Sequence, residues 1–206
     1  MAQITSGLRR VLSVPVVYNL WQNLVGAKRS RSLVCSDHFR VAPGQRVVDV
    51  GCGTGEILDY LPEGIAYYGF DLDPGYIRTA QARYEGRGHF TCADITSLPA
   101  DAIPPCDLAI AFGLLHHLDD DGARALLAHL FQRLAPGGRL VTIDGVWVEG
   151  QSALARALIA RDRGQNVRDT AGYLALVPAE FSSRTLVVRH DLLRIPSSLA
   201  IMECTK

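Results

Sequence analysis

Short apolar runs alternate with amphipathic stretches through the middle of the chain. Such runs are typical of buried strands, and we predict strands at residues 46–50, 66–70, 89–93, 107–111 and 139–144. Capping residues and apolar stripes between them predict helices from Glu56 to Leu61, from Pro74 to about Tyr84, and from residues 119–121 to Leu134. Strands that alternate with helices predict a doubly wound α/β fold, in which helices cover both faces of a parallel sheet.

The two ends of the chain follow other patterns. Residues 14–40 repeat apolar side chains at helical spacing, which predicts one or two helices before the first strand. Near the end, the strand-like runs 184–195 and 198–204 are separated only by Pro196 and Ser197. So short a connection cannot hold a crossover helix, so we predict an antiparallel hairpin. We expect a single domain with N-terminal helices (1–42), a core (43–144), an insert (145–183) and the hairpin (184–206).

Three glycines at alternate positions, Gly51, Gly53 and Gly55, follow the first predicted strand. Glycines let a tight turn bring backbone N–H groups close to a ligand. The dinucleotide fingerprint G-x-G-x-x-G places its third glycine one residue later than here. The carboxylate of Asp49 would repel a pyrophosphate, and it suits a ligand with a positive end. S-adenosylmethionine carries a sulfonium and an ammonium group and no phosphate.

The other predicted strands also end at chemically useful residues. The second ends at Asp71, 20 residues after Gly51, and the third ends at Asp94. The fourth leads to residues 112–118, F-G-L-L-H-H-L, and the fifth ends at Asp144. Ligands of open α/β sheets bind beyond the carboxyl ends of the strands, where a carboxylate such as Asp71 can accept both ribose hydroxyls.

The pattern D-V-G-C-G-T-G over 49–55, these strand ends and the turn at 134–140 strongly resemble the class I (seven-stranded, Rossmann-like) S-adenosylmethionine-dependent methyltransferases, small-molecule branch. The resemblance implies a mostly parallel seven-stranded sheet with a C-terminal antiparallel hairpin. It implies that S-adenosylmethionine is bound by Asp49, Gly51, Cys52, Gly53, Asp71, Leu72, Asp94, Ile95, Phe112, Gly113 and His117. In that family the first four positions hold the methionine part, Asp71 the ribose, and residues 94–95 the adenine. Residues 112–113 lie under the sulfonium and His117 near the adenosine.

Methyl transfer is an in-line displacement, so the enzyme mainly aligns the acceptor with the S–CH₃ bond. A general base is needed only where the acceptor must lose a proton. The candidate bases are His116, His117, Asp144, Tyr173 and His190. We predict catalytic roles for His117 and Asp144, the alternatives being local packing for the histidine and a capping role for the aspartate.

The acceptor is expected to meet the two variable parts of the chain. We expect Arg161, Arg163 and Tyr173 of the insert to bind it, because a guanidinium fits a carboxylate or phosphate of an anionic acceptor. The alternative is a solvated loop with local ion pairs. N-terminal residues, among them Tyr18, Trp21, Gln22 and Lys28, are expected to form a lid over the cofactor.

Composition limits the remaining possibilities. The 206 residues are 48% hydrophobic and 20% charged with a formal net charge of zero, which argues against a nucleic-acid partner. Five scattered cysteines indicate a reduced, cytoplasmic environment, and we expect no metal site and no membrane span. The protein is expected to be a monomer or homodimer. The rival functions are a non-catalytic S-adenosylmethionine-binding accessory protein and an NAD-dependent oxidoreductase.

Overall fold

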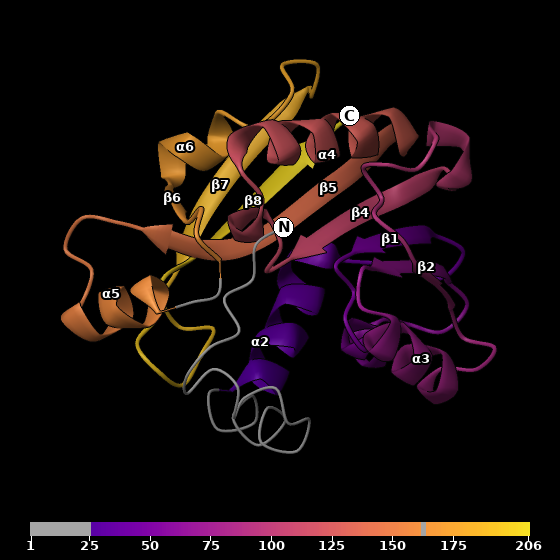
Figure 1. The fold of residues 1–206 in the computed structure, drawn as a ribbon, viewed down its shortest axis with the longest axis horizontal. Coiled ribbons are helices and arrows are strands. Elements are labelled where there is room, and N and C mark those ends of the chain that lie inside the picture. The colour runs from indigo at the N-terminus through magenta and orange to yellow at the C-terminus, as the bar shows by residue number, and fades with distance from the viewer. Residues whose placement is uncertain (1–25, 162–163) are drawn as a thin grey trace.

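The computed structural model describes residues 26–161 and 164–206, and its centre is one twisted sheet (Figure 1). The strands lie in the order β3-β2-β1-β4-β5-β8-β7, and a two-residue β6 pairs with β5 outside this path. Pairing is parallel from β3 to β5, whereas β8 runs antiparallel to both β5 and β7. The bounds are β1 Arg46–Val50, β2 Ala66–Asp71, β3 His89–Cys92, β4 Cys106–Phe112, β5 Leu134–Trp147, β6 Arg168–Asp169, β7 Ser183–Arg189 and β8 Leu199–Thr205. The predicted doubly wound, mostly parallel sheet with its C-terminal hairpin is confirmed.

Helices cover both faces of this sheet. In Figure 1, α4 and α6 lie on one side, and α2 and α3 lie on the other. The helices are α2 Ala27–Val34, α3 Pro74–Arg83, α4 Asp120–Arg133, α5 Ala153–Ala160 and α6 Thr170–Leu174, with single turns η2 Cys35–Phe39, η3 Glu56–Tyr60, η4 Ala100–Ala102 and η5 Leu115–His117. The N-cap expected at Asp73 is confirmed, since its side chain accepts hydrogen bonds from the first turn of α3. Asp119, one of the three aspartates expected at the start of the next helix, caps α4 in the same way.

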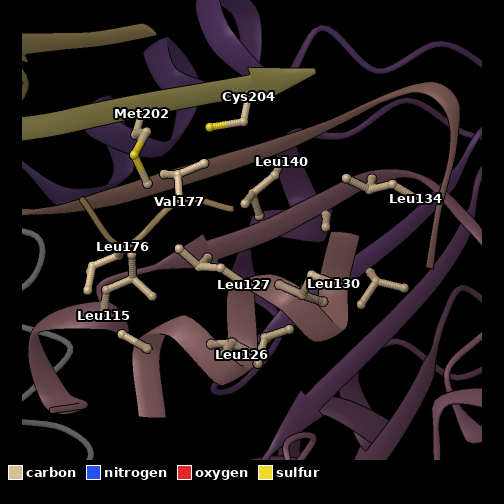
Figure 2. Packing of buried hydrophobic residues seen from close by; sticks show 14 of the residues in the cluster. Leu115, Leu126, Leu127, Leu130, Leu134, Leu140, Leu176, Val177, Met202 and Cys204 are labelled. Carbon is tan, nitrogen blue, oxygen red and sulfur yellow. The ribbon is translucent and has the colours of Figure 1, made fainter. Parts of the chain in front are cut away.

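Successive side chains of the central strands point to opposite faces of the sheet and contribute to two separate apolar cores. Val48 and Ala109 face the core under α4, whereas Val47 and Leu108 face the core under α2 and α3. Figure 2 shows the first core, where leucines of α4 pack against side chains of β5 and β8. Both faces of the central strands are therefore dry, which leaves the strand ends as the place for polar chemistry.

Two predicted elements differ in the structure. Residues 56–60 form a 3₁₀ turn, not an α-helix, because Gly55 begins the segment at φ +75° and Pro62 follows it closely. Strand β7 ends at Arg189, so residues 190–195 belong to the loop before β8. The side chain of Leu192 turns into the core instead, and it is fully buried.

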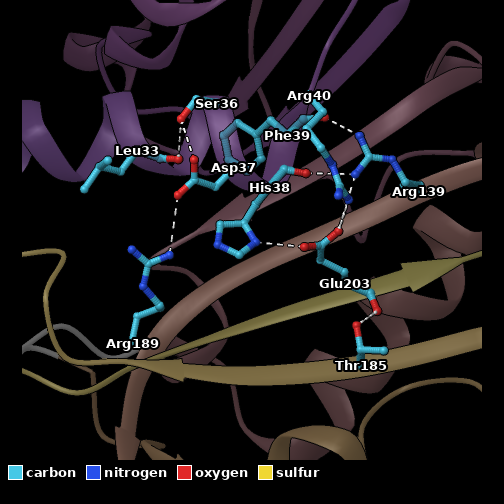
Figure 3. Close-up of polar contacts among 10 residues, drawn as sticks. All are labelled: Leu33, Ser36, Asp37, His38, Phe39, Arg40, Arg139, Thr185, Arg189 and Glu203. Carbon is cyan, nitrogen blue, oxygen red and sulfur yellow. Dashed lines mark hydrogen bonds and ion pairs between the residues drawn. The ribbon is translucent and has the colours of Figure 1, made fainter.

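The N-terminal segment is fixed to the sheet by a polar network (Figure 3). Glu203 of β8 accepts from His38 at 2.8 Å and pairs with Arg40. Arg139 of β5 donates to the carbonyl oxygens of His38 and Phe39. The described part of this segment thus packs against the sheet, and Lys28, one of the residues expected in a lid over the cofactor, is exposed on it. The other expected lid residues, Tyr18, Trp21 and Gln22, lie outside the described residues.

Candidate cofactor and active site

The glycine loop after β1 combines tight packing with one open position. Gly51 and Cys52 donate their N–H groups to the carbonyl of Phe70, at 2.8 and 3.1 Å. A Cβ on Gly55 would come within 2.8 Å of the Phe90 ring, so packing against the sheet requires this glycine. Gly53 has φ +55°, and nothing lies within 4 Å of the position its Cβ would take. The loop therefore leaves room for a ligand at Gly53.

Asp71 at the end of β2 connects this loop to the neighbouring strand. Its Oδ2 accepts from the N–H of Gly53 and its Oδ1 from the N–H of Asp73, both at 2.9 Å. Each carboxylate oxygen has a second lone pair. Leu72 beside it is 44% exposed, so an apolar side chain is available at this strand end. This corner can hold a ribose and an apolar ring.

The end of β3 adds a second carboxylate to this corner. Asp94 is exposed, and its Oδ1 accepts from the N–H and the hydroxyl of Thr96, at 3.0 and 2.6 Å. Ile95 is 4% exposed and packs in the core under α4. Asp94 thus lies at the predicted edge, with one oxygen already engaged in a local turn.

Asp49 is almost completely buried, with 1% of its surface exposed. Its Oδ2 accepts from the hydroxyl of Tyr67 at 2.5 Å, while its Oδ1 has no partner among the described residues. Burial raises the pKa of this carboxyl to about 7, and the Tyr67 hydrogen bond opposes the increase. A cationic ligand would favour the ionised form and supply the missing partner, so this site fits the positive end of S-adenosylmethionine.

Cys52 in the same loop is a packing residue. Its sulfur would lie 2.8 Å from a Cβ on Gly69 of β2, so it fills the space against that strand. Burial and the charges of Asp49 and Asp71 raise the pKa of its thiol. The neutral thiol is a small side chain that fits, not a nucleophile.

A buried histidine–aspartate pair lies at the ends of β4 and β5. The Nδ1 of His116 is 2.7 Å from the Oδ1 of Asp144, and the two residues are 8% and 2% exposed. The backbone N–H of His116 donates to the same oxygen at 3.2 Å. Burial raises the pKa of the Asp144 carboxyl, and the hydrogen bonds from His116 oppose the increase. A proton on Nδ1 of His116 directs the lone pair of Nε2 away from the carboxylate.

Two glycines flank the His116 ring. A Cβ on Gly113 would lie 3.9 Å from its Cε1, and one on Gly164 would lie 1.9 Å from its Cδ2. Gly113 has φ +69° and donates its N–H to the carbonyl of Ile143 at 2.7 Å, which joins the ends of β4 and β5. Phe112, the last residue of β4, is half-buried. The ring thus adjoins the segment that the family resemblance places under the sulfonium.

Catalytic roles were predicted for His117 and Asp144 separately. In the structure Asp144 lies at the end of β5 as expected, and the histidine that contacts it is His116. His117 is half-buried, and its ring centroid lies 4.2 Å from that of His116. Two adjacent histidines could not be told apart by sequence, because the choice depends on the one-turn helix η5 and on the β4–β5 register.

The residues expected to bind the acceptor have mostly structural contacts. Tyr173 is 1% exposed and donates its hydroxyl to the carbonyl of Gly145 at 2.8 Å, so it is a core residue and not an acceptor contact. Arg161 ends α5 and donates to the carbonyl of Ala157 at 3.2 Å. Arg156 lies over the Trp147 ring. Arg163 lies outside the described residues.

Within the described ranges, His, Cys, Asp and Glu side chains form no group of three or more that could hold a metal ion. No described helix combines the length and apolarity needed to cross a bilayer.

The fold and the strand-end site define a class of protein. Residues 47–138 match the family model described as a methyltransferase domain. Human N-acetylserotonin methyltransferase, solved in complex with S-adenosylmethionine, is similar in fold, with a TM-score of 0.70 and 20% identity over 93% of this chain and 54% of that chain. We therefore assign residues 47–138 to the methyltransferase domain family, and the fold is that of the class I S-adenosylmethionine-dependent methyltransferases.

Curated relatives extend the similarity at the level of sequence. An O-methyltransferase of Pyrenophora dematioidea is 29% identical over 168 residues, 73% of this chain and 62% of that protein. A trans-aconitate 2-methyltransferase of Methylobacterium nodulans is 39% identical over 104 residues, 48% of this chain and 38% of that protein. The chain thus spans less than two thirds of the length of either relative.

Gly53→Ala tests the open position of the glycine loop. We expect affinity for S-adenosylhomocysteine, the demethylated cofactor, to fall at least about tenfold. The reason is that the alanine methyl group would occupy the open space at Gly53 in which the ligand is expected to bind. Strain at φ +55° adds about 1–2 kcal/mol of destabilisation. Gly86→Ala is a matched control, since Gly86 has φ +76° and open space around its Cβ position but lies between α3 and β3. Isothermal titration should show weakened binding only for Gly53→Ala; equal loss in both variants would contradict the assignment.

Proposed function

We propose that this protein transfers a methyl group from S-adenosylmethionine to a hydroxyl group of a small-molecule acceptor. The observation that carries the proposal is the buried His116–Asp144 pair beside Gly113, at the same sheet edge as the glycine loop. The methyltransferase domain match and the O-methyltransferase relative support it.

The cofactor would be held by the residues of the first two strand ends. The Oδ1 of Asp49, which has no hydrogen-bond partner among the described residues, and the open space at Gly53 would bind the methionine part. Asp71 would bind the ribose. Leu72, Asp94 and Ile95 would surround the adenine, and Phe112, Gly113 and His117 would line the remaining side. S-adenosylmethionine supplies an activated methyl carbon when bound.

The pair would act on the acceptor. A hydroxyl is a weak nucleophile until it loses its proton, and the Nε2 of His116 is the atom that would take it. Asp144 holds the proton on Nδ1, fixes the ring and would stabilise the imidazolium that forms, as in other oriented histidine bases. The pair would thus hold a deprotonated acceptor oxygen toward the methyl carbon that S-adenosylmethionine would supply, with S-adenosylhomocysteine as the leaving group.

An anionic acceptor is a narrower proposal that rests on Arg161 and Arg163. The support is chemical: a guanidinium can bind a carboxylate or phosphate of the acceptor through two parallel hydrogen bonds. Alanine at both positions would raise the KM of an anionic acceptor and leave that of a neutral phenol unchanged.

Parallel isothermal titrations with S-adenosylmethionine, S-adenosylhomocysteine and NAD test the proposal first. Micromolar binding of the first two without NAD binding would support it, and NAD binding alone would overturn it. A screen of phenols and hydroxy acids with labelled S-adenosylmethionine then tests catalysis. Binding without transfer to any acceptor would favour the accessory-protein alternative. Light scattering on the same sample distinguishes the monomer from the homodimer.

A further inference from the structure

Arg168 of the insert makes several hydrogen bonds to the segment that carries His116. Its side chain is only 10% exposed and reaches back from β6 to the loop after β4. Its Nη1 donates to the carbonyl of Leu115 at 3.1 Å, and its Nη2 donates to the carbonyl of Leu118 at 2.9 Å. Its Nε donates to the carboxylate of Asp120 at 2.8 Å. One planar group therefore holds both sides of the His116–His117 pair.

Other residues of the insert also contact the segments that carry His116 and Asp144. The carbonyl of His116 itself accepts from the N–H of Asn166 at 3.0 Å. The guanidinium of Arg168 lies 5.8 Å from the centre of the Tyr173 ring. The hydroxyl of Tyr173 in turn donates to the carbonyl of Gly145, the residue after Asp144. Both members of the buried pair are thus held from the same side by neighbouring residues of the insert.

We infer that Arg168 and Tyr173 are positioning residues that set the His116 ring against Asp144. The inference rests on the proposed function, in which His116 is the base. Within the turn, the carbonyl of Leu115 accepts from the N–H of Leu118 at 3.1 Å. The carbonyls of His116 and Leu118 accept instead from Asn166 and Arg168 of the insert, because so short a helix leaves its last carbonyls without intrahelical partners. A guanidinium presents five N–H donors in a fixed plane and can satisfy three separate acceptors at once. An ammonium group is a point charge and cannot span them.

The chain offers a matched control. Arg124 on α4 also pairs with Asp120, at 3.3 Å, and its other ion pair is with Asp121 of the same helix, at 3.5 Å. Arg124→Lys therefore perturbs the same carboxylate and leaves the backbone of η5 alone. Tyr173→Phe removes only the hydroxyl and keeps the ring, so it is a second test variant if the Arg168 variants do not fold.

The test is the tautomer of His116 in the cofactor-free protein, read from imidazole ¹⁵N spectra and assigned with His116→Asn. We expect the wild type and Arg124→Lys to show a single Nδ1–H tautomer. Arg168→Lys, Arg168→Gln and Tyr173→Phe should show loss of that single signature. Titration with S-adenosylhomocysteine should give a Kd within about twofold of wild type, since these residues do not touch the glycine loop.

The outcomes separate this inference from the proposed function. An unchanged tautomer in Arg168→Gln and Tyr173→Phe, or an equal change in Arg124→Lys, would overturn the positioning role, even if thermal stability fell. Failure of the wild-type protein to bind S-adenosylhomocysteine would overturn the proposed function without affecting the tautomer result.

Discussion

Replacing His116 by Asn is expected to lower kcat for methyl transfer by about 10²- to 10⁴-fold, the usual loss on removing a general base. The Asn amide can still donate to Asp144, so the buried carboxylate keeps a partner and the fold is retained. What disappears is the Nε2 lone pair that would accept the hydroxyl proton. KM for the acceptor and Kd for S-adenosylhomocysteine should change by less than about threefold, because the lost interaction is made only in the transition state.

The effect is measured as kcat and KM with the acceptor found in the screen. His190→Asn is the control, because His190 is an exposed histidine of the β7–β8 loop whose Nδ1 lies 3.0 Å from the hydroxyl of Ser198. Its kcat should match that of the wild type. If His116→Asn kept full kcat, the acceptor would not need deprotonation, and His116 would have a structural role only.

Replacing Asp49 by Asn is expected to stabilise the folded protein at pH 8 while weakening cofactor binding. The pKa of the Asp49 carboxyl is raised from 3.8 to about 7 in the folded state, so folding favours the protonated form. As pH rises from about 4 to about 7, the unfolded chain releases this proton first, and the free energy of unfolding falls by up to about 4 kcal/mol. Asn carries no charge and avoids this loss, although its buried amide leaves a donor unsatisfied. The net gain at pH 8 should be about 1–3 kcal/mol.

Urea unfolding between pH 5 and pH 8 measures the effect on stability. Titration with S-adenosylmethionine measures the effect on cofactor binding. We expect Asp49→Asn to show a flatter pH dependence and at least about a tenfold larger Kd. Tyr67→Phe provides a test of sign. It removes the hydrogen bond that lowers the pKa of Asp49, so the loss of stability should continue to higher pH than in the wild type. A wild-type protein whose stability did not fall over this range would contradict the buried, uncompensated carboxyl.

The local pattern of the chain was sufficient to predict most of the fold. The Val run at 47–50, the Asp73–Pro74 helix start and the stripe of α4 each correspond to an element of the structure. Such signals are local, since burial of alternate faces and capping act within a few residues. The 3₁₀ turn at 56–60 and the loop at 190–195 were not predicted, because distant contacts add to the local effects of Gly55 and Pro62 in the turn and bury Leu192 in the loop. One example is Arg87, which donates to the carbonyls of Leu58 and Leu61.

The candidate site likewise has residues that the sequence predicts and residues that only tertiary packing places. The sequence by itself determined the glycine loop and the carboxylates Asp49, Asp71, Asp94 and Asp144, because parallel strands bring their carboxyl ends to one edge whatever the side chains between them. Only the tertiary structure decided that His116, not His117, meets Asp144, that Tyr173 is buried, and that Arg168 holds the loop. These contacts join residues 28 to 53 positions apart, and long-range packing, not spacing along the chain, sets which side chain turns inward.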